Sequence, residues 1–193
     1  MAFTVSEFKS NISSAGGGAR PALYRISVTA RDTSFSFSDN ESLLVKTTAI
    51  PPATIAPLTV NYAGRAYKWT GLRTFDNWTT TVLNDENFSI RNKIMLWMRR
   101  ISGKMDGDRA GVFGDPVMNA DGNYLDAFAT VSQMGTDGKE TQHYKFYSLW
   151  PTELAEIPVD WSSDMIEEYS ITWAYDYWGH GEPSSETNVV DAS

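Results

Sequence analysis

The most regular pattern in the chain is an alternation of apolar and polar residues, which is typical of β-strands. Residues 24–30 alternate strictly, and residues 78–83 are β-branched or aromatic, as suits a pleated sheet surface. Further strand candidates lie at residues 34–38, 42–48, 65–70, 127–133 and 142–149. An Asp-Gly pair at 137–138 between the last two candidates is a hairpin signal. These patterns predict a chain that is mainly β.

The longest alternation is near the C-terminal end and predicts one strand over residues 168–177. One face carries Tyr169, Ile171, Trp173, Tyr175 and Tyr177, and the other carries Glu168, Ser170, Thr172, Ala174 and Asp176. Aromatic side chains on one face favour packing against a core, so the polar face would meet water or a lumen. With the aromatic face, we expect Trp78 and Trp97 to define the core.

One helix is predicted, over residues 86–101. Ile90, Ile94, Trp97 and Ile101 recur at spacings of four, three and four and make one apolar stripe, which we interpret as core packing. Asn84 or Asp85 could accept the free amide hydrogens of the first turn, and basic residues at 99–100 suit the C-terminal end of the helix dipole.

The other segments predict one domain with two extensions. Residues 1–19 are polar, contain three consecutive glycines and predict a flexible arm. Residues 50–64 begin with Pro51-Pro52 and predict a long connection, while the Gly/Asp-rich residues 102–123 predict a long loop. The domain would span residues 20–178, with an acidic tail at 179–193.

Candidate chemistry is sparse, and no enzymatic function is expected. The chain has no cysteine and only two histidines, His143 and His180, and it contains none of the common nucleophile or phosphate-binding motifs. Asp106, Asp108 and Gly111 resemble part of a calcium loop, but apolar residues occupy positions that need oxygen ligands. The carboxylate pairs Glu153/Glu156 and Glu167/Glu168 suggest a solvated acidic surface. We therefore predict no catalytic residue, no cofactor and no metal. No run approaches the ~18 apolar residues of a membrane-spanning helix, and no secretory signal or membrane anchor is expected.

The charge is unevenly distributed. Residues 1–101 carry 12 Lys/Arg against 7 Asp/Glu, a net +5, whereas residues 102–193 carry 4 against 17, a net −13, which sums to the chain's −8. Such halves can attract other copies head to tail, although net charge also simply keeps a protein soluble. The acidic balance argues against tight binding of nucleic acid, which depends on lysine and arginine.

Three segments, in order along the chain, resemble the tail tube proteins of T4-like contractile-tailed phages. The first segment is ARPALY at 19–24 followed by KTTAIP at 46–51. The second is RTFDNW at 73–78 running into VLNDENF at 82–88. The third is LWPTEL at 149–154, then DW at 160–161, IEE at 166–168 and YDYW at 175–178. Together they frame residues 19–178. Two regions depart from the family pattern, because residues 102–123 are longer and 179–193 extend past the usual end.

The resemblance implies an antiparallel β-sandwich or partial barrel with one flanking helix. It also implies hexameric rings that stack into a hollow tube, with strands of neighbouring subunits forming a continuous inner barrel. Expected partners are further copies of the chain, the tail sheath protein, and the baseplate and tail-terminator proteins. Genomic double-stranded DNA would pass through the lumen without specific binding. The protein would be a virion component assembled in the host cytoplasm.

On this interpretation, specific residues acquire expected roles. The polar residues Glu168, Ser170, Thr172 and Asp176 would face the lumen. Contacts between subunits or rings would involve Arg20, Pro21, Ile50, Pro51 and Pro52.

Other functions stay open at this point. The chain could be the baseplate protein that initiates a tube, or the tube subunit of a related contractile injection system. From a different class, a ligand-binding β-barrel carrier predicts a monomer that encloses an apolar cavity. A hydrolase using the acidic pairs has the least support.

Overall fold

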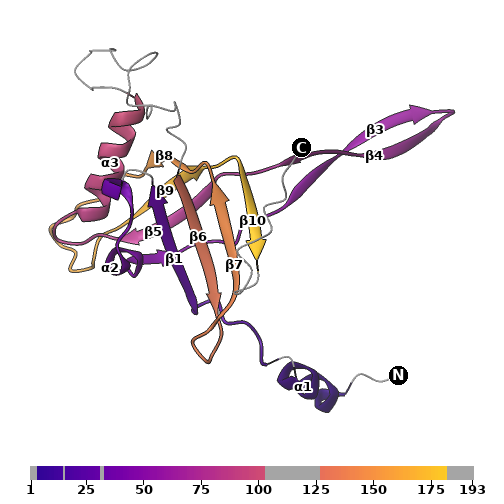
Figure 1. The fold of residues 1–193 in the computed structure, drawn as a ribbon, viewed down its shortest axis with the longest axis horizontal. Coiled ribbons are helices and arrows are strands. Elements are labelled where there is room, and N and C mark those ends of the chain that lie inside the picture. The colour runs from indigo at the N-terminus through magenta and orange to yellow at the C-terminus, as the bar shows by residue number, and fades with distance from the viewer. Residues whose placement is uncertain (1–3, 15, 31–32, 103–126, 182–193) are drawn as a thin grey trace.

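Two four-stranded antiparallel sheets face each other in the computed structural model, which describes residues 4–14, 16–30, 33–102 and 127–181 (Figure 1). The first sheet has the order β1 (Tyr24–Ala30), β6 (Ala127–Met134), β7 (Glu140–Tyr147) and β10 (Tyr177–Gly181). The second has the order β2 (Val45–Thr47), β5 (Trp78–Leu83), β9 (Glu168–Ala174) and β8 (Trp150–Leu154). Among the described strands neither sheet closes into a barrel, so β1, β10, β2 and β8 are edges. The predicted antiparallel sandwich is confirmed.

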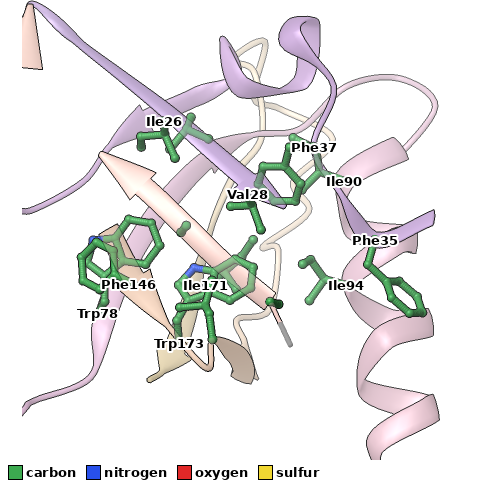
Figure 2. Close-up of a cluster of buried hydrophobic side chains, with 14 of the residues drawn as sticks. Ile26, Val28, Phe35, Phe37, Trp78, Ile90, Ile94, Phe146, Ile171 and Trp173 are labelled. Atoms are coloured by element: carbon green, nitrogen blue, oxygen red, sulfur yellow. The ribbon is translucent and has the colours of Figure 1, made fainter. Parts of the chain in front are cut away.

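The core fills the space between the sheets with aromatic and branched side chains (Figure 2). The expected core residues are all buried, namely Trp78, Trp97, Tyr169, Ile171, Trp173 and Tyr175. The Trp78 ring from one sheet stacks on the Phe146 ring from the other, with 4.5 Å between their centroids. Apolar burial of this kind is the main force that holds the two sheets together.

The predicted helix is α3 (Ser89–Ser102), and it flanks the sandwich (Figure 1). Ile90, Ile94 and Trp97 are buried, so the apolar stripe packs on the core as expected. The helix begins three residues later than predicted because Phe88 has a φ of 53°, which breaks the helical path. Asp85 still caps it, since its Oδ1 accepts a 2.9 Å hydrogen bond from the Ser89 amide.

Three short helical segments were not predicted. They are α1 (Val5–Ser14), the 3₁₀ helix η1 (Thr33–Phe35) and α2 (Asp39–Ser42). The predicted arm thus contains a helix, α1, which buries none of its residues. The strand predicted at 34–38 is wrong, because residues 34–35 belong to η1 and residues 36–38 form no strand. The two phenylalanines of this segment are nevertheless buried: the Phe35 ring packs on the Trp97 ring, and the Phe37 ring packs on the Trp173 ring.

The connection predicted at 50–64 is also wrong, because most of it is a strand. β3 (Thr54–Tyr62) pairs with β4 (Arg65–Thr74) in a two-stranded hairpin that extends away from the body (Figure 1). The strand predicted at 65–70 is the first part of β4. Alternation at 58, 60 and 62 continues past the prolines, and the Ala63-Gly64 turn joins the strands with positive φ at both residues.

The single strand predicted at 168–177 is two strands. β9 ends at Ala174, and the chain then crosses to the other sheet, where β10 begins at Tyr177. The Asp176 amide marks the crossing, since it donates a hydrogen bond to the carbonyl of Tyr147 in β7. Gly179–181 accordingly belong to β10 and not to a tail. The predicted tail from 182 onward and the predicted loop from 103 onward lie outside the described residues. None of the described helices is long and apolar enough to cross a membrane.

Candidate functional site

The β3–β4 hairpin has one apolar face that nothing in the described chain covers. The register pairs Leu58 with Trp69 and Val60 with Tyr67, and it places these residues with Tyr62 on one side. All five are exposed, and Trp69 retains 66% of its accessible surface. Arg65 pairs with Tyr62 and lies on the same side, next to the turn. The opposite side carries the polar residues Thr59, Asn61, Lys68 and Thr70, together with Pro57 and Ala66. We call the five residues Leu58, Val60, Tyr62, Tyr67 and Trp69 the apolar hairpin face.

A bulge shapes the hairpin near its base. The register shifts between Ile55 and Pro57, because Gly71 and Leu72 of β4 lie opposite the single residue Ala56 of β3. A Cβ added at Gly71 would come within 2.3 Å of the Ala56 carbonyl oxygen, so only glycine allows the two backbones to approach this closely.

The outer face of the second sheet is lined with hydroxyl groups. Thr79 pairs with Thr172 and Thr81 pairs with Ser170 across β5 and β9, whose alternate residues Trp78, Val82, Ile171 and Trp173 are buried in the core. Glu168 lies on the same face of β9 and pairs with the Lys46 ammonium from β2. Of the four residues predicted to face a lumen, Glu168, Ser170 and Thr172 therefore share one surface. Asp176 is exposed in the bend after β9 and is not part of that strand.

The predicted contact residues come from two places in the fold. Arg20 and Pro21 form the exposed turn before β1, where the Gln133 side chain donates a 2.8 Å hydrogen bond to the Arg20 carbonyl. Ile50 and Pro52 are exposed in the segment that leads into β3. Pro51, between them, is buried within the subunit and is therefore not available to a partner. The sequence reasoning did not predict the apolar hairpin face, although the alternation on both sides of Ala63-Gly64 would have indicated it.

The acidic residues form structural pairs. Glu167 accepts a 2.7 Å hydrogen bond from the Asn84 amide, whereas its neighbour Glu168 pairs with Lys46, so these two carboxylates have different partners. His143 Nδ1 lies 3.2 Å from a Glu140 carboxylate oxygen. Within the described ranges no group of three or more acidic or histidine side chains could hold a metal ion. The calcium-like residues 106–111 lie outside those ranges.

One partly buried ion pair ties α2 to α3. The Lys93 ammonium lies 2.7 Å from the Glu41 carboxylate and donates a second hydrogen bond to the Ser36 carbonyl. Both the amide and the hydroxyl of Ser38 donate to the same Glu41 oxygen. The Glu41 amide in turn donates to the Ser38 hydroxyl, so the two residues form a capping box. Burial alone would raise the pKa of Glu41, but the hydrogen bonds from Lys93 and Ser38 outweigh it and lower the pKa below its ordinary value. We interpret this network as structural.

Sequence comparison links most of the chain to one family. A family model described as "Phage tail tube protein" matches residues 4–180. The chain is 30% identical over 165 residues to "Tail tube protein gp19" of Enterobacteria phage T4, which covers 84% of this chain and 92% of that protein. The "Tail tube protein" of Serratia phage KSP90 is 25% identical over 164 residues, covering 83% of this chain and 86% of the relative.

Solved structures show the same fold at low sequence identity. A chain in the extended sheath-tube complex of the extracellular contractile injection system PVC superposes with a TM-score of 0.56 at 13% identity, covering 94% of this chain and 99% of that chain. A chain in the baseplate of the anti-feeding prophage superposes with a TM-score of 0.59 at 8% identity, covering 87% and 98%.

Proposed function

The chain belongs to the phage tail tube protein family, and we propose that it is the repeating subunit of the inner tail tube of a contractile phage tail. Copies would form hexameric rings, and the rings would stack into a hollow tube inside the sheath. The role is structural, with no catalytic step.

The apolar hairpin face is the observation that supports assembly most strongly. An isolated two-stranded hairpin is marginally stable in water, and this one presents five exposed apolar side chains on one side. Contiguous exposed apolar surface marks an interaction site. Where the partner surface lies elsewhere on a second copy, the contact is heterologous, and contacts of this kind generate rings or open filaments.

The open sheets supply further contacts for a tube. β2 and β8 leave the edges of the second sheet available, and pairing between neighbouring subunits would remove edges that otherwise invite uncontrolled association. The exposed residues Arg20, Pro21, Ile50 and Pro52 remain candidates for contacts within or between rings.

We place the outer face of the second sheet toward the lumen. Glu168, Ser170 and Thr172 would line it together with Thr79 and Thr81, and the exposed Asp176 would lie at its margin. Hydroxyl and carboxylate groups offer few of the cationic contacts that hold phosphate, so DNA could slide past this wall.

The proposed partners follow from the role as a tube subunit. The outside of the tube would contact the sheath protein, and its ends would contact the baseplate and the tail-terminator proteins. Genomic double-stranded DNA would pass through without sequence-specific binding. The tube would be part of the virion and would assemble in the host cytoplasm.

A charge placed on the apolar hairpin face tests the proposal. Trp69→Asp should abolish rings and tubes in negative-stain images, or raise the protein concentration needed for them at least tenfold, because burying an unpaired charge is costly. Thr59→Asp is the matched control, since it adds the same charge opposite Lys68 on the polar side. Both variants should keep the melting temperature of the subunit. Equal assembly of Trp69→Asp and Thr59→Asp would contradict the assigned role of this face.

The alternatives make different predictions. A tube initiator or the tube subunit of an injection system would share the fold and assemble, and neighbouring genes would distinguish them. A ligand-binding carrier would stay monomeric at every salt and protein concentration. The packed aromatic rings between the sheets favour the tube, since a carrier needs an open apolar cavity there (Figure 2).

A further inference from the structure

One tryptophan of the body, Trp178, contacts the base of the hairpin. The guanidinium carbon of Arg73, near the end of β4, lies 4.7 Å from the centroid of the Trp178 ring in β10. The same guanidinium lies 4.9 Å from the Phe75 ring. The indole N–H of Trp178 donates a 3.2 Å hydrogen bond to the Pro52 carbonyl, just before β3 begins. One side chain of β10 thus contacts both ends of the hairpin.

Trp178 is itself fixed to the body. Its ring packs edge-on against the Tyr144 ring of β7, with 5.9 Å between the centroids, and it packs against the buried core. Phe75 makes a parallel link, because its ring contacts Tyr175, which in turn contacts the buried Phe146. The base of the hairpin is therefore connected to the core through aromatic rings in edge-to-face contact.

The segment leading into β3 has a particular need for such support. Pro51 and Pro52 have no amide hydrogen, so this stretch has only its carbonyls for backbone pairing. The Trp78 indole donates to the Ala49 carbonyl at 3.0 Å, and the Trp178 indole donates to the Pro52 carbonyl. The indoles of Trp78 and Trp178 thus bind the backbone carbonyls on either side of residues 50–51.

We propose that Trp178, Arg73 and the Pro52 carbonyl form a clamp that fixes the direction of the hairpin before it meets a second copy of the chain. A hairpin held in its docking direction loses less freedom on binding, so the clamp favours assembly without contributing a contact to the partner. Trp178 and Arg73 are then positioning residues. This role rests on the proposed function, whereas the clamp itself can be tested in the isolated subunit.

The first measurement is a distance between the hairpin and the body. The chain has no cysteine, so spin labels can be attached at Asn61→Cys on β3 and Thr79→Cys on β5. Pulsed electron paramagnetic resonance on dilute monomer then gives the distance distribution. Trp178→Leu and Arg73→Met should each widen the distribution at least twofold. The matched controls are Trp161→Leu, at a fully exposed tryptophan, and Lys68→Met, at a hairpin cation outside the clamp. Both controls should leave the width unchanged.

The second measurement is the protein concentration at which half of the unlabelled chain assembles. Arg73→Met should raise it about tenfold, with an unchanged thermal melt because Arg73 is exposed. An unchanged distance distribution in both clamp variants would overturn the clamp, and Arg73→Met alone decides this if Trp178→Leu fails to fold. A widened distribution with unchanged assembly would overturn the positioning role. If the unmodified chain forms no tubes, the proposed function fails, while the distance measurement still decides whether the clamp exists.

Discussion

Trp173 is the residue whose truncation should damage the subunit most. Its side chain is fully buried at the centre of the sandwich, where its ring contacts those of Phe37, Trp78 and Trp97 (Figure 2). Its indole N–H donates a 3.0 Å hydrogen bond to the buried hydroxyl of Thr80. Trp173→Ala would remove ring contacts to β5, to the helix and to Phe37 in the segment before α2, and would leave the Thr80 hydroxyl without this partner.

The expected loss is a large part of the total stability. Truncating a buried aromatic side chain to alanine costs about 3–5 kcal/mol, and an unsatisfied buried hydroxyl adds about 1–3 kcal/mol. The two terms overlap in part, so we expect about 5 kcal/mol in the free energy of unfolding. A domain has about 5–15 kcal/mol in total, which places the variant near the limit of folding. Trp173→Phe keeps most of the ring contacts and should cost about 2 kcal/mol, chiefly through Thr80.

Urea unfolding followed by far-ultraviolet circular dichroism provides the measurement. Trp161→Ala is the matched control, because that tryptophan is fully exposed and its removal should change the unfolding free energy by less than about 0.5 kcal/mol. A loss below about 2 kcal/mol for Trp173→Ala would show that the core is not organised around this ring. Equal losses at positions 173 and 161 would refute the assignment of the buried face of β9.

Three further predictions concern the hairpin, the capping network and the proposed lumen. Gly71→Ala should open the bulge against the Ala56 carbonyl and speed hydrogen exchange in β3 and β4, with little change in the body; unchanged exchange would contradict the close approach. Because the pKa of Glu41 is lowered in the folded chain, its ionised carboxylate stabilises the fold above about pH 4.5, and this stabilisation is lost as the pH falls through the lowered pKa. Glu41→Gln should therefore weaken the dependence of the melting temperature on pH in that acidic range. An unaltered pH dependence would show that the network does not stabilise the fold in this way. Lysine at both 168 and 176 should leave folding nearly intact and slow DNA ejection, whereas unchanged ejection would remove Glu168 and Asp176 from the lumen.

The body of the fold could be predicted because its signals are local. The alternation in β1 and β9 and the stripe of α3 each report burial on one side of a single element. The break between β9 and β10 could not be predicted in this way. Tyr175 and Tyr177 continue the alternation, but the chain changes sheets between them, and this crossing is set by the pairing of β10 with β7.

The prediction failed most clearly at the proposed assembly surface. Pro51 and Pro52 were interpreted as signs of a connection, although proline, such as Pro57 within β3, is tolerated where a strand has no neighbour on one side. In the two-stranded hairpin, β3 and β4 each have one side without a neighbouring strand. Its apolar residues also resemble a core strand in the sequence, because burial by another copy leaves the same pattern as burial within the chain.

The arrangement of polar and apolar surface explains why assembly should depend on the hairpin more than on the broad sheet faces. The core rings of Trp78, Phe146 and Trp173 use the inner faces of both sheets, and the outer face of the second sheet carries threonine and serine hydroxyls. Such a face is well hydrated and contributes little apolar area to a contact. The apolar hairpin face is exposed and extends away from the body, so it can reach a second copy without covering that polar sheet. Its location therefore separates the surface that would join subunits from the surface that would line a channel, and each can change in sequence with little effect on the other.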